Sequence, residues 1–184
     1  TTTTTTWYWV DGERTTMRRG DFIITPSMTW HDHTNETNEP MFWLDGLDIP
    51  IVQFLDASFA EGAKDDQQKI SKPVGDSFAR YGHNMAPVRH DAPYGQTSPI
   101  FSYPYDRSRE ALDRLERSEA IDPWDGVKLR YVNPLTGGSP MPTMQTFMQR
   151  LPAGFAQSHA GREQVATGGG LPVQHLAGGE DRKS

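Results

Sequence analysis

Short apolar runs separated by polar turn residues make up the first 55 residues of the chain. The run at 7–10 is followed by the turn pair Asp11-Gly12, and a second apolar run lies within 17–26. Apolar runs on both sides of an Asp-Gly pair predict a β-hairpin. The stretch at 30–33 also has an extended pattern, and the remaining apolar runs of this part lie at 41–44 and 49–55. Their short lengths and turn-bounded spacing predict several strands of a β-sandwich or barrel.

The pattern changes between residues 56 and 140, where the sequence is polar and rich in proline and glycine. Such a length without strand periodicity predicts a connection between two domains. The segment 141–155 again has a strand pattern, which ends in Pro-Ala-Gly. The tail after it has three consecutive glycines and few apolar residues, so it is a poor folding segment by itself.

One helix is predicted within the connection, at 108–118. Either Asp106 or Ser108 is expected to cap its start. Glu110 and Arg114 are four positions apart and can form an ion pair on the helix surface. The apolar residues on one face of this helix are Ala111, Leu112 and Leu115.

Composition supports strands and turns over a helical bundle, because only 35% of residues are hydrophobic and there are 17 glycines and 14 prolines. The formal net charge of -6 argues against a nucleic-acid binder. The sequence has no cysteine, which excludes disulfides and thiolate metal sites and fits a reducing cytoplasm. No membrane span is expected, because the sequence has no run of 18 apolar residues. No signal peptide is expected either, because the N-terminus has no basic region and no long apolar core.

Two histidines in the stretch ITPSMTWHDHTNE are the first candidates for chemistry. In an extended strand His31 and His33 point to one face and Asp32 points to the other. Two imidazoles on one face can bind a divalent metal. A lone His-x-His pair is a weak signal, however, and two polar residues at a strand end remain the alternative.

The spacing around these histidines resembles the second sequence motif of the cupins, which are small jelly-roll barrels. The matching positions are Gly20, Pro26, His31 and Asn35, while Met28 stands where the motif usually has glycine. The resemblance implies that His31 is a metal ligand. It also implies that the motif's other two ligands, a His-x-His pair, belong upstream of it.

A longer resemblance covers roughly residues 10–155. The stretches "WHDH…WLDGLDIP", "GQTSPIFSYPYDRSREALDRL" and "TMQTFMQRLPAGF" resemble the bicupin ring-cleaving dioxygenases, the family of gentisate, salicylate and 1-hydroxy-2-naphthoate dioxygenases. The resemblance implies an all-β cupin fold, Fe(II) held by three histidines, a homotetramer, and no nucleic-acid or membrane partner. It implies cleavage of gentisate with O2 to maleylpyruvate in the cytoplasm.

The resemblance also implies roles for three residues. His31 is the expected iron ligand. His33 is expected to face the same cavity and to hydrogen-bond substrate or shuttle a proton. Asp45 matches an acidic residue near the substrate, where it could orient an imidazole or accept a proton from a ring hydroxyl. No residue is expected to bind an organic cofactor.

Other residues near these motifs have more ordinary expectations. Trp30 and Trp43 are expected to pack in the core, with a place in the wall of the site as the alternative. Asp48 is expected to be a turn residue. Arg18 and Arg19 are candidates for gripping a substrate carboxylate, although surface exposure is expected for at least one of them. The histidines expected to lie in loops without a metal role are His83, His90, His159 and His175.

The resemblance predicts an incomplete chain with three parts: the C-terminal half of a first cupin at 1–55, a connection at 56–140, and the start of a second cupin at 141–184. A frame error near either end is one hypothesis for the departures there. Two alternatives to gentisate cleavage stay open. The chain could act on salicylate or 1-hydroxy-2-naphthoate, or it could be a metal-free cupin piece with only a binding or structural role.

Overall fold

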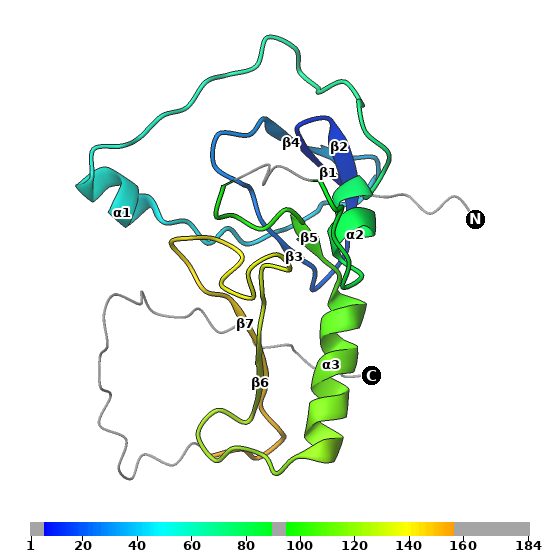
Figure 1. Cartoon of the computed structure of the whole chain (residues 1–184), viewed down its shortest axis with the longest axis vertical. Coiled ribbons are helices and arrows are strands. Elements are labelled where there is room, and N and C mark those ends of the chain that lie inside the picture. The colour runs from blue at the N-terminus through cyan, green and yellow to red at the C-terminus, as the bar shows by residue number, and fades with distance from the viewer. Residues whose placement is uncertain (1–5, 90–94, 157–184) are drawn as a thin grey trace.

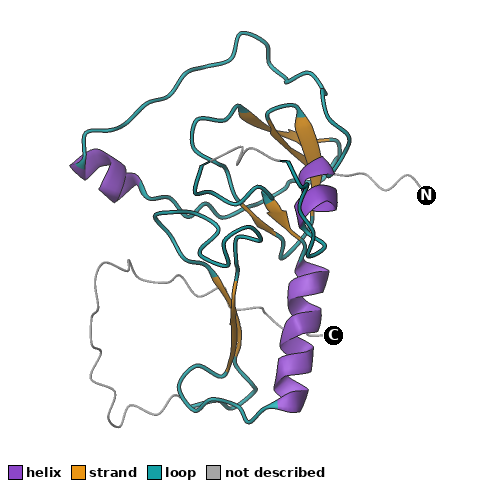
Figure 2. Cartoon of the chain, in the orientation of Figure 1, coloured by secondary structure: helices purple, strands orange, loops and turns teal. Residues whose placement is uncertain are grey.

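The computed structural model describes residues 6–89 and 95–156 (Figure 1). These described residues form seven short strands and three helices, which are connected by long loops (Figure 2). The strands are β1 (Thr6–Val10), β2 (Glu13–Met17), β3 (Phe22–Ile23), β4 (His31–Asn35), β5 (Ser102–Tyr103), β6 (Val127–Arg130) and β7 (Phe147–Arg150). The helices are α1 (Ile49–Phe54), α2 (Asp76–Tyr81) and α3 (Tyr105–Ser118).

The first sheet has three antiparallel strands in the order β2-β1-β4. The predicted hairpin is present, but its second strand is β2 and not the run at 17–26. Asp11 and Gly12 form the turn with φ of 44° and 78°, the left-handed conformations that a tight hairpin turn requires. The chain then turns again at Gly20, so the later run contributes only Met17 to β2 and Phe22 and Ile23 to β3.

The main hydrophobic core lies between this sheet and the β3–β5 pair. Tyr8 and Val10 of β1 pack with Ile24 and Phe101, all four of which are almost fully buried. Phe22 pairs with Tyr103 across β3 and β5, so the core combines residues from the first 55 positions with residues from within the predicted connection. The structure describes three two- or three-stranded sheets and no closed barrel within its described residues.

The other face of the first sheet is covered by a polar strap, residues 61–72. The backbone N–H of Gln68 donates to the Asp32 carboxylate at 3.0 Å, and that of Ser71 donates to the Gly12 carbonyl at 3.0 Å. A Cβ atom on Gly12 would lie 2.1 Å from the Ser71 hydroxyl, so glycine is needed there for packing as well as for its positive φ. Most of 56–140 lacks regular structure, yet this part of it is attached to the sheet.

Helix α3 packs beside the β6–β7 hairpin in the lower part of Figure 1. Leu112 is buried on the helix face that meets these strands. Arg150 of β7 donates to Glu116 at 2.6 Å and to Asp113 at 2.5 Å, so one guanidinium joins the strand to two turns of the helix. The predicted ion pair between Glu110 and Arg114 is present at 2.7 Å.

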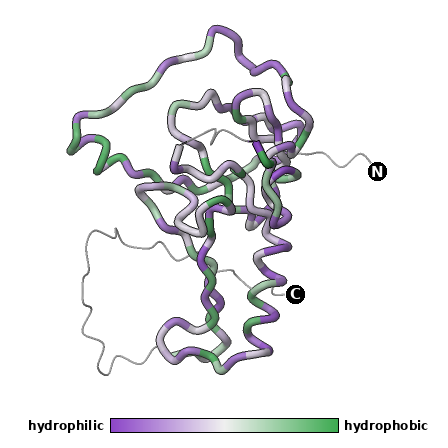
Figure 3. Tube along the Cα trace, in the orientation of Figure 1, coloured by the Kyte–Doolittle hydropathy of each residue, from purple (hydrophilic) through white to green (hydrophobic). Residues whose placement is uncertain are grey.

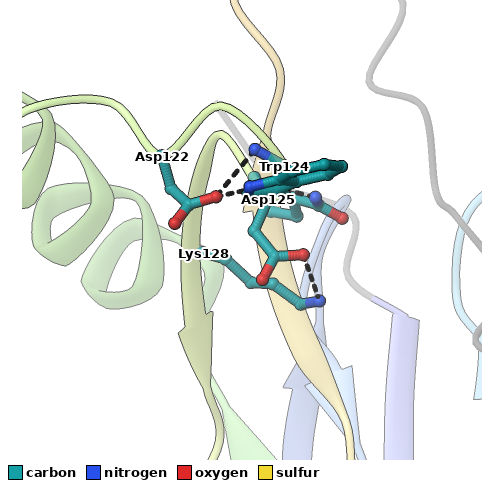
Figure 4. Close-up of polar contacts among 5 residues, drawn as sticks. Asp122, Trp124, Asp125 and Lys128 are labelled. Atoms are coloured by element: carbon teal, nitrogen blue, oxygen red, sulfur yellow. Dashed lines mark hydrogen bonds and ion pairs between the residues drawn. The ribbon is translucent and has the colours of Figure 1, made fainter. Parts of the chain in front are cut away.

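The turn that leads into β6 is built by side-chain acceptors (Figure 4). The Asp122 carboxylate accepts from the backbone N–H groups of Trp124 at 2.7 Å and Asp125 at 2.8 Å. Asp125 pairs with Lys128 at 3.2 Å. Gly126 has φ of 65°, and a Cβ there would lie 2.7 Å from the Arg150 carbonyl, which fixes glycine at this close approach of β6 and β7.

Four predicted elements differ from the structure. No strand forms at 41–44, and the apolar run at 49–55 is helix α1, because Pro50 fits the first turn of a helix and cannot donate to a strand ladder. Helix α3 begins at Tyr105 after Pro104, so neither Asp106 nor Ser108 caps it. The strand predicted within 141–155 is limited to Phe147–Arg150. The predictions for the tail, 157–184, lie outside the described residues.

Candidate functional site

His31 and His33 lie on the same face of β4, as the alternating pattern predicts. Both are directly opposite residues of β1, with His33 across from Tyr8 and His31 across from Val10. The ring centroids of the two imidazoles are 6.2 Å apart, and their planes are nearly perpendicular at 89°. This face of the sheet is the one that carries the core residues Tyr8 and Val10.

The ring of Tyr8 lies next to both histidine rings. Its ring centroid lies 4.8 Å from that of His33 and 6.3 Å from that of His31. The tyrosine hydroxyl hydrogen-bonds the hydroxyl of Thr25. Burial raises the pKa of Tyr8 to about 12, with smaller contributions of the same sign from the carboxylates of Asp45 and Asp32. Tyr8 therefore stays protonated and neutral at every physiological pH.

His33 is shielded on one side by Trp43. The two rings are stacked, with centroids 4.8 Å apart and planes within 8° of parallel. Desolvation lowers the pKa of His33, and the neighbouring His31 lowers it further, while Asp45 and Asp32 act in the opposite direction. The neutral imidazole that results can accept a proton or a hydrogen bond, which a general base requires.

Asp45 lies near this face and is exposed. Its carboxylate acts electrostatically on both Tyr8 and His33. Asp48, expected in a turn, precedes α1, and its carboxylate accepts a 2.7 Å hydrogen bond from the hydroxyl of Thr143. This bond ties the segment after the histidines to the segment before β7.

Two motif positions upstream of His31, Gly20 and Met28, have the left-handed backbone conformation that the motif's turns need. Gly20 has φ of 87°, and a Cβ on it would lie 2.7 Å from the ring of Tyr105. Met28 has φ of 62°, the left-handed conformation that a glycine adopts without strain. The substitution of glycine by methionine therefore leaves the turn intact. Pro26, the motif's proline, is fully buried between these two turns.

The described residues do not by themselves fit a three-histidine iron centre. Within residues 6–89 and 95–156 there is no group of three histidine, aspartate or glutamate side chains placed to hold a metal ion. The donors on this face are the two imidazoles of His31 and His33, which are two ligands and not three. Any iron site that uses His31 therefore needs ligands from outside the described residues.

The structure contradicts the expectations for two tryptophans, and it also shows where two arginines and one loop histidine lie. Trp30 and Trp43 are not core residues, because their exposed fractions are 45% and 50%, and Trp43 instead covers one face of His33. Arg18 and Arg19 are both exposed. His83 lies in a loop against Phe78. The other histidines with loop expectations, His90, His159 and His175, lie outside the described residues.

Tyr8 and Thr25 were not singled out from the sequence, although both belong to this face. The signal for Tyr8 was its place in β1, where the strand period puts it opposite His33 once the pairing is known. A hollow of about 400 Å³ lies elsewhere, between the end of α3 and the β6–β7 hairpin, and it shares no residue with the histidine face. None of the helices in the described parts of the chain is long and apolar enough to cross a membrane.

Comparison with known proteins places these motifs in a family context. Residues 4–47 match the family described as "Cupin domain". Gentisate 1,2 dioxygenase 1 of Aquipseudomonas alcaligenes is 55% identical over 146 residues, which are 79% of this chain and 42% of that protein. The 1-hydroxy-2-naphthoate 1,2-dioxygenase of Nocardioides sp. (strain KP7) is 40% identical over 152 residues, 82% of this chain and 38% of that protein.

The fold is similar to a solved structure as well. The crystal structure of salicylate 1,2-dioxygenase from Pseudoaminobacter salicylatoxidans, in adducts with gentisate, matches with a TM-score of 0.66 and 30% identity over 78% of this chain and 41% of that one. The chain spans about two fifths of the length of the curated relatives it matches. It thus contains a cupin sequence and is related, over about four fifths of its own length, to the gentisate, salicylate and 1-hydroxy-2-naphthoate dioxygenases.

Proposed function

We propose that this chain contributes to Fe(II)-dependent cleavage of the gentisate ring with O2, giving maleylpyruvate. The observation that carries the proposal is the pairing of His31 and His33 on one face of β4, over Tyr8 and beside Asp45, in a sequence 55% identical to a gentisate 1,2-dioxygenase. Salicylate or 1-hydroxy-2-naphthoate cleavage is the alternative, since relatives with those names match as well. The second alternative is that the chain is a metal-free cupin piece with only a binding or structural role.

Each of the three residues has a distinct role in this proposal. His31 supplies one imidazole to the iron, and the remaining ligands come from outside the described residues. When bound, Fe(II) would bring the ring and O2 together and transfer electron density between them. His33, held by Trp43 and kept neutral by its surroundings, accepts a hydrogen bond or proton from a ring hydroxyl. Asp45 orients that imidazole or receives the proton in turn.

The arrangement of the whole protein is proposed in the same way. Residues 1–55 correspond to the later half of a first cupin, 56–140 to the connection, and 141–184 to the start of a second. The pairing of β3 with β5, and of β6 with β7, ties the connection to both flanks. A homotetramer and a cytoplasmic location remain predictions from the resemblance and from the cysteine-free sequence.

A chimera tests the function directly. The matched segment of the Aquipseudomonas alcaligenes dioxygenase is replaced by the corresponding residues of this chain, and iron content, O2 uptake and ring-cleavage product are measured with gentisate. We expect an iron-loaded, active chimera. His31→Ala should lose iron and activity, whereas His33→Ala and Asp45→Asn should keep iron and lose turnover.

His83→Ala is the matched control, because His83 is a loop histidine away from the site, and it should keep both iron and activity. A folded, iron-loaded chimera that takes up no O2 with gentisate would reject gentisate cleavage. The same chimera is then supplied with salicylate and with 1-hydroxy-2-naphthoate, so that the two alternatives are separated by their substrate. Iron bound equally well after His31→Ala would reject the assigned ligand.

A further inference from the structure

Four buried side-chain polar atoms of the described residues have no hydrogen-bond partner, and all four belong to the region between the first sheet and the strap of residues 61–72. They are the indole Nε1 of Trp9, the guanidinium Nε of Arg14, the carboxylate Oδ1 of Asp32 and the amide Nε2 of Gln68. Buried polar atoms in native proteins are nearly always paired. Four exceptions gathered in one region therefore need a common explanation.

The strand register places three of these residues in one row. Trp9 of β1 is directly opposite Arg14 of β2 and Asp32 of β4. Directly opposite residues share one side of a sheet, with their Cβ atoms about 4.5–5.5 Å apart. Because Tyr8 and Val10 point into the core, Trp9 points away from it, yet only 3% of Trp9 is exposed. The row is therefore covered although it lies outside the core.

Gln68 is the residue that the strap inserts against this row. All other residues between 61 and 71 are exposed. The backbone N–H of Gln68 donates to Asp32 Oδ2 at 3.0 Å, and its side-chain Oε1 accepts from the backbone N–H of Gly12 at 2.9 Å. These bonds use one oxygen of the carboxylate and one end of the amide, and the other ends stay unpaired. Figure 3 shows the strap coloured mostly as hydrophilic, so the cover itself is polar.

The chemistry of the four atoms selects one kind of ligand. Trp9, Arg14 and Gln68 offer N–H donors, whereas Asp32 offers a negatively charged acceptor. An anion would be repelled by the carboxylate, and a cation would be repelled by the guanidinium. Water both accepts and donates, so it can pair with the N–H groups and with the carboxylate at once. An internal water typically makes about three such bonds to buried polar groups.

The covering of the row also restricts what can reach it. The four atoms are already buried by described residues, so a further segment of a longer chain has no access to them. A molecule that passes the strap is required instead. A hollow of about 340 Å³ lies between the strap and Trp30, and Gln68 is one of its lining residues. Gln68 therefore borders both the hollow and the row, and rotation of its side chain would connect them.

We propose that the strap encloses an internal water site on the outer face of the first sheet. Ordered water there accepts hydrogen bonds from Trp9 Nε1 and Gln68 Nε2 and donates one to Asp32 Oδ1. Arg14 Nε, at the other end of the row, donates to the same enclosed water. An unpaired buried polar atom costs more free energy than a typical hydrogen bond contributes, so the hydrated form is the stable one. The strap is then a cover that opens locally to let this water exchange.

The proposal stands apart from the proposed activity, because it uses only contacts on the face of the sheet away from the histidine side chains. It is tested in the full 184-residue chain by the contacts of tryptophan indole N–H groups with water. The chain has five tryptophans, so each indole N–H signal in the NMR spectrum can be assigned by substitution. We expect a nuclear Overhauser cross-peak between Trp9 Nε1–H and water, with the sign of a long-lived bound water.

Trp7 provides an internal control in the same spectrum. Its indole N–H donates to the Glu36 carboxylate at 2.9 Å in an exposed position. Its contacts with water should therefore show the sign of short-lived surface hydration, and its N–H should exchange with solvent faster than that of Trp9. A slowly exchanging Trp9 N–H without a water cross-peak would overturn the proposal.

Gln68→Met should abolish the Trp9 cross-peak, because methionine has a similar length but offers no N–H to water. Gln67→Met is the matched control, since Gln67 also gives the strap one side-chain hydrogen bond, to the Thr34 hydroxyl at 3.3 Å. It should keep the cross-peak. Loss in both variants, or in neither, would contradict Gln68 as a ligand of the water. Rapid exchange of the Trp9 N–H in Gln68→Met would mean that Gln68 holds only the cover, which also overturns the proposal.

A crystal structure at a resolution that shows ordered water is an independent test. We expect density within hydrogen-bond distance of both Trp9 Nε1 and Asp32 Oδ1. A direct hydrogen bond between the indole and the carboxylate, with no water beside them, would overturn the proposal. Anomalous signal at this position after a bromide soak would also overturn it, because the ligand would then be an anion.

Discussion

The imidazole of His33 and the indole of Trp43 lie face to face, 4.8 Å apart and within 8° of parallel. Seven residues without helix or strand, 36–42, separate β4 from Trp43, and the stack holds the indole against the sheet. The indole limits the rotation of the imidazole and shields one of its faces. His33, which is an exposed residue of β4, is thus restricted on one side by the indole.

Replacing Trp43 by leucine should free the His33 ring. The ring protons of His33 should then move downfield in the NMR spectrum, because the shielding from the stacked indole is lost. The free energy of unfolding should fall by about 1 kcal/mol or less, as for a half-exposed ring pair. Trp30→Leu is the control, since Trp30 is exposed to a similar degree and should leave the His33 resonances in place. Unchanged His33 shifts in Trp43→Leu would contradict the stack.

Met28→Gly should stabilise the protein. Met28 has φ of 62° and an exposed side chain, so the substitution removes backbone strain while little packing is lost. A left-handed conformation costs a residue with a side chain about 1–2 kcal/mol, and part of this is offset by the greater freedom of glycine in the unfolded chain. We expect a net gain of up to about 1 kcal/mol in thermal or urea unfolding.

Met85→Gly is the matched comparison for that substitution. Met85 is also exposed but has no positive φ, so glycine there should be neutral or destabilising. If Met28→Gly destabilised the protein as much as Met85→Gly, Met28 would not have the strained left-handed backbone conformation described above.

Glu13 gives the stability a defined pH dependence. The residue is 3% exposed, and its carboxylate accepts hydrogen bonds from the backbone N–H and the hydroxyl of Ser77 at 2.9 and 2.8 Å. Burial raises the pKa of Glu13 above the usual 4.5 despite these bonds, and the nearby Asp76 carboxylate adds to the effect. The folded state therefore holds the proton more tightly than the unfolded state does.

It follows that the contribution of Glu13 to stability is favourable below the unfolded pKa and is lost as pH rises through the folded pKa. Glu13→Gln keeps an acceptor for Ser77 but cannot ionise. Relative to the parent, this variant should gain stability as pH rises from the unfolded pKa through the raised folded pKa, by about 1.4 kcal/mol for each unit of pKa displacement. Melting temperatures across this range measure it, with Glu39→Gln as an exposed control. A difference that is constant with pH would refute the prediction.

Arg150→Lys should weaken the attachment of β7 to α3. The guanidinium contacts Asp113 and Glu116 together, which a single ammonium group cannot reproduce, although the charge is kept. The melting temperature should fall, and the loss should shrink at high salt because the pairs are partly exposed. Arg114→Lys, in a pair confined to the surface of α3, should have a smaller effect. Equal decreases in melting temperature for the two variants would mean that the Arg150 guanidinium does not join β7 to α3.

Local signals in the sequence predicted the local parts of the structure. The Asp11-Gly12 turn, the extended stretch around His31 and the helix near 108–118 were predicted correctly because each depends on residues close to one another. The run at 49–55 was predicted as a strand because apolar runs of that length fit either element, and Pro50 at a helix start decided it. Neither the strap on Asp32 nor Phe101 in the core was foreseen, since each joins residues far apart in the chain.

In the candidate site, too, the sequence predicts what depends on neighbouring residues but not what depends on residues far apart in the chain. The pairing of His31 and His33 on one face follows from the period of a strand. That Tyr8 lies beneath them depends on the register of β1 against β4, which the sequence does not specify. Trp43 was expected in the core because it is large and apolar, but it is 50% exposed and contacts His33 with one face of its ring.

The pairing of β3 with β5 has a consequence for synthesis on the ribosome. The backbone N–H of Ile24 donates a hydrogen bond to the carbonyl of Phe101, and Phe101 fills the core beside Tyr8 and Val10. The first sheet therefore emerges long before the residue that closes its core. Synthesis proceeds at about 5–20 residues per second, so several seconds pass between the first sheet and residue 101. During this time the side chains of Tyr8 and Val10 remain unpacked in the nascent chain. During that interval they are available to chaperones, and a pause in translation before residue 101 would extend it.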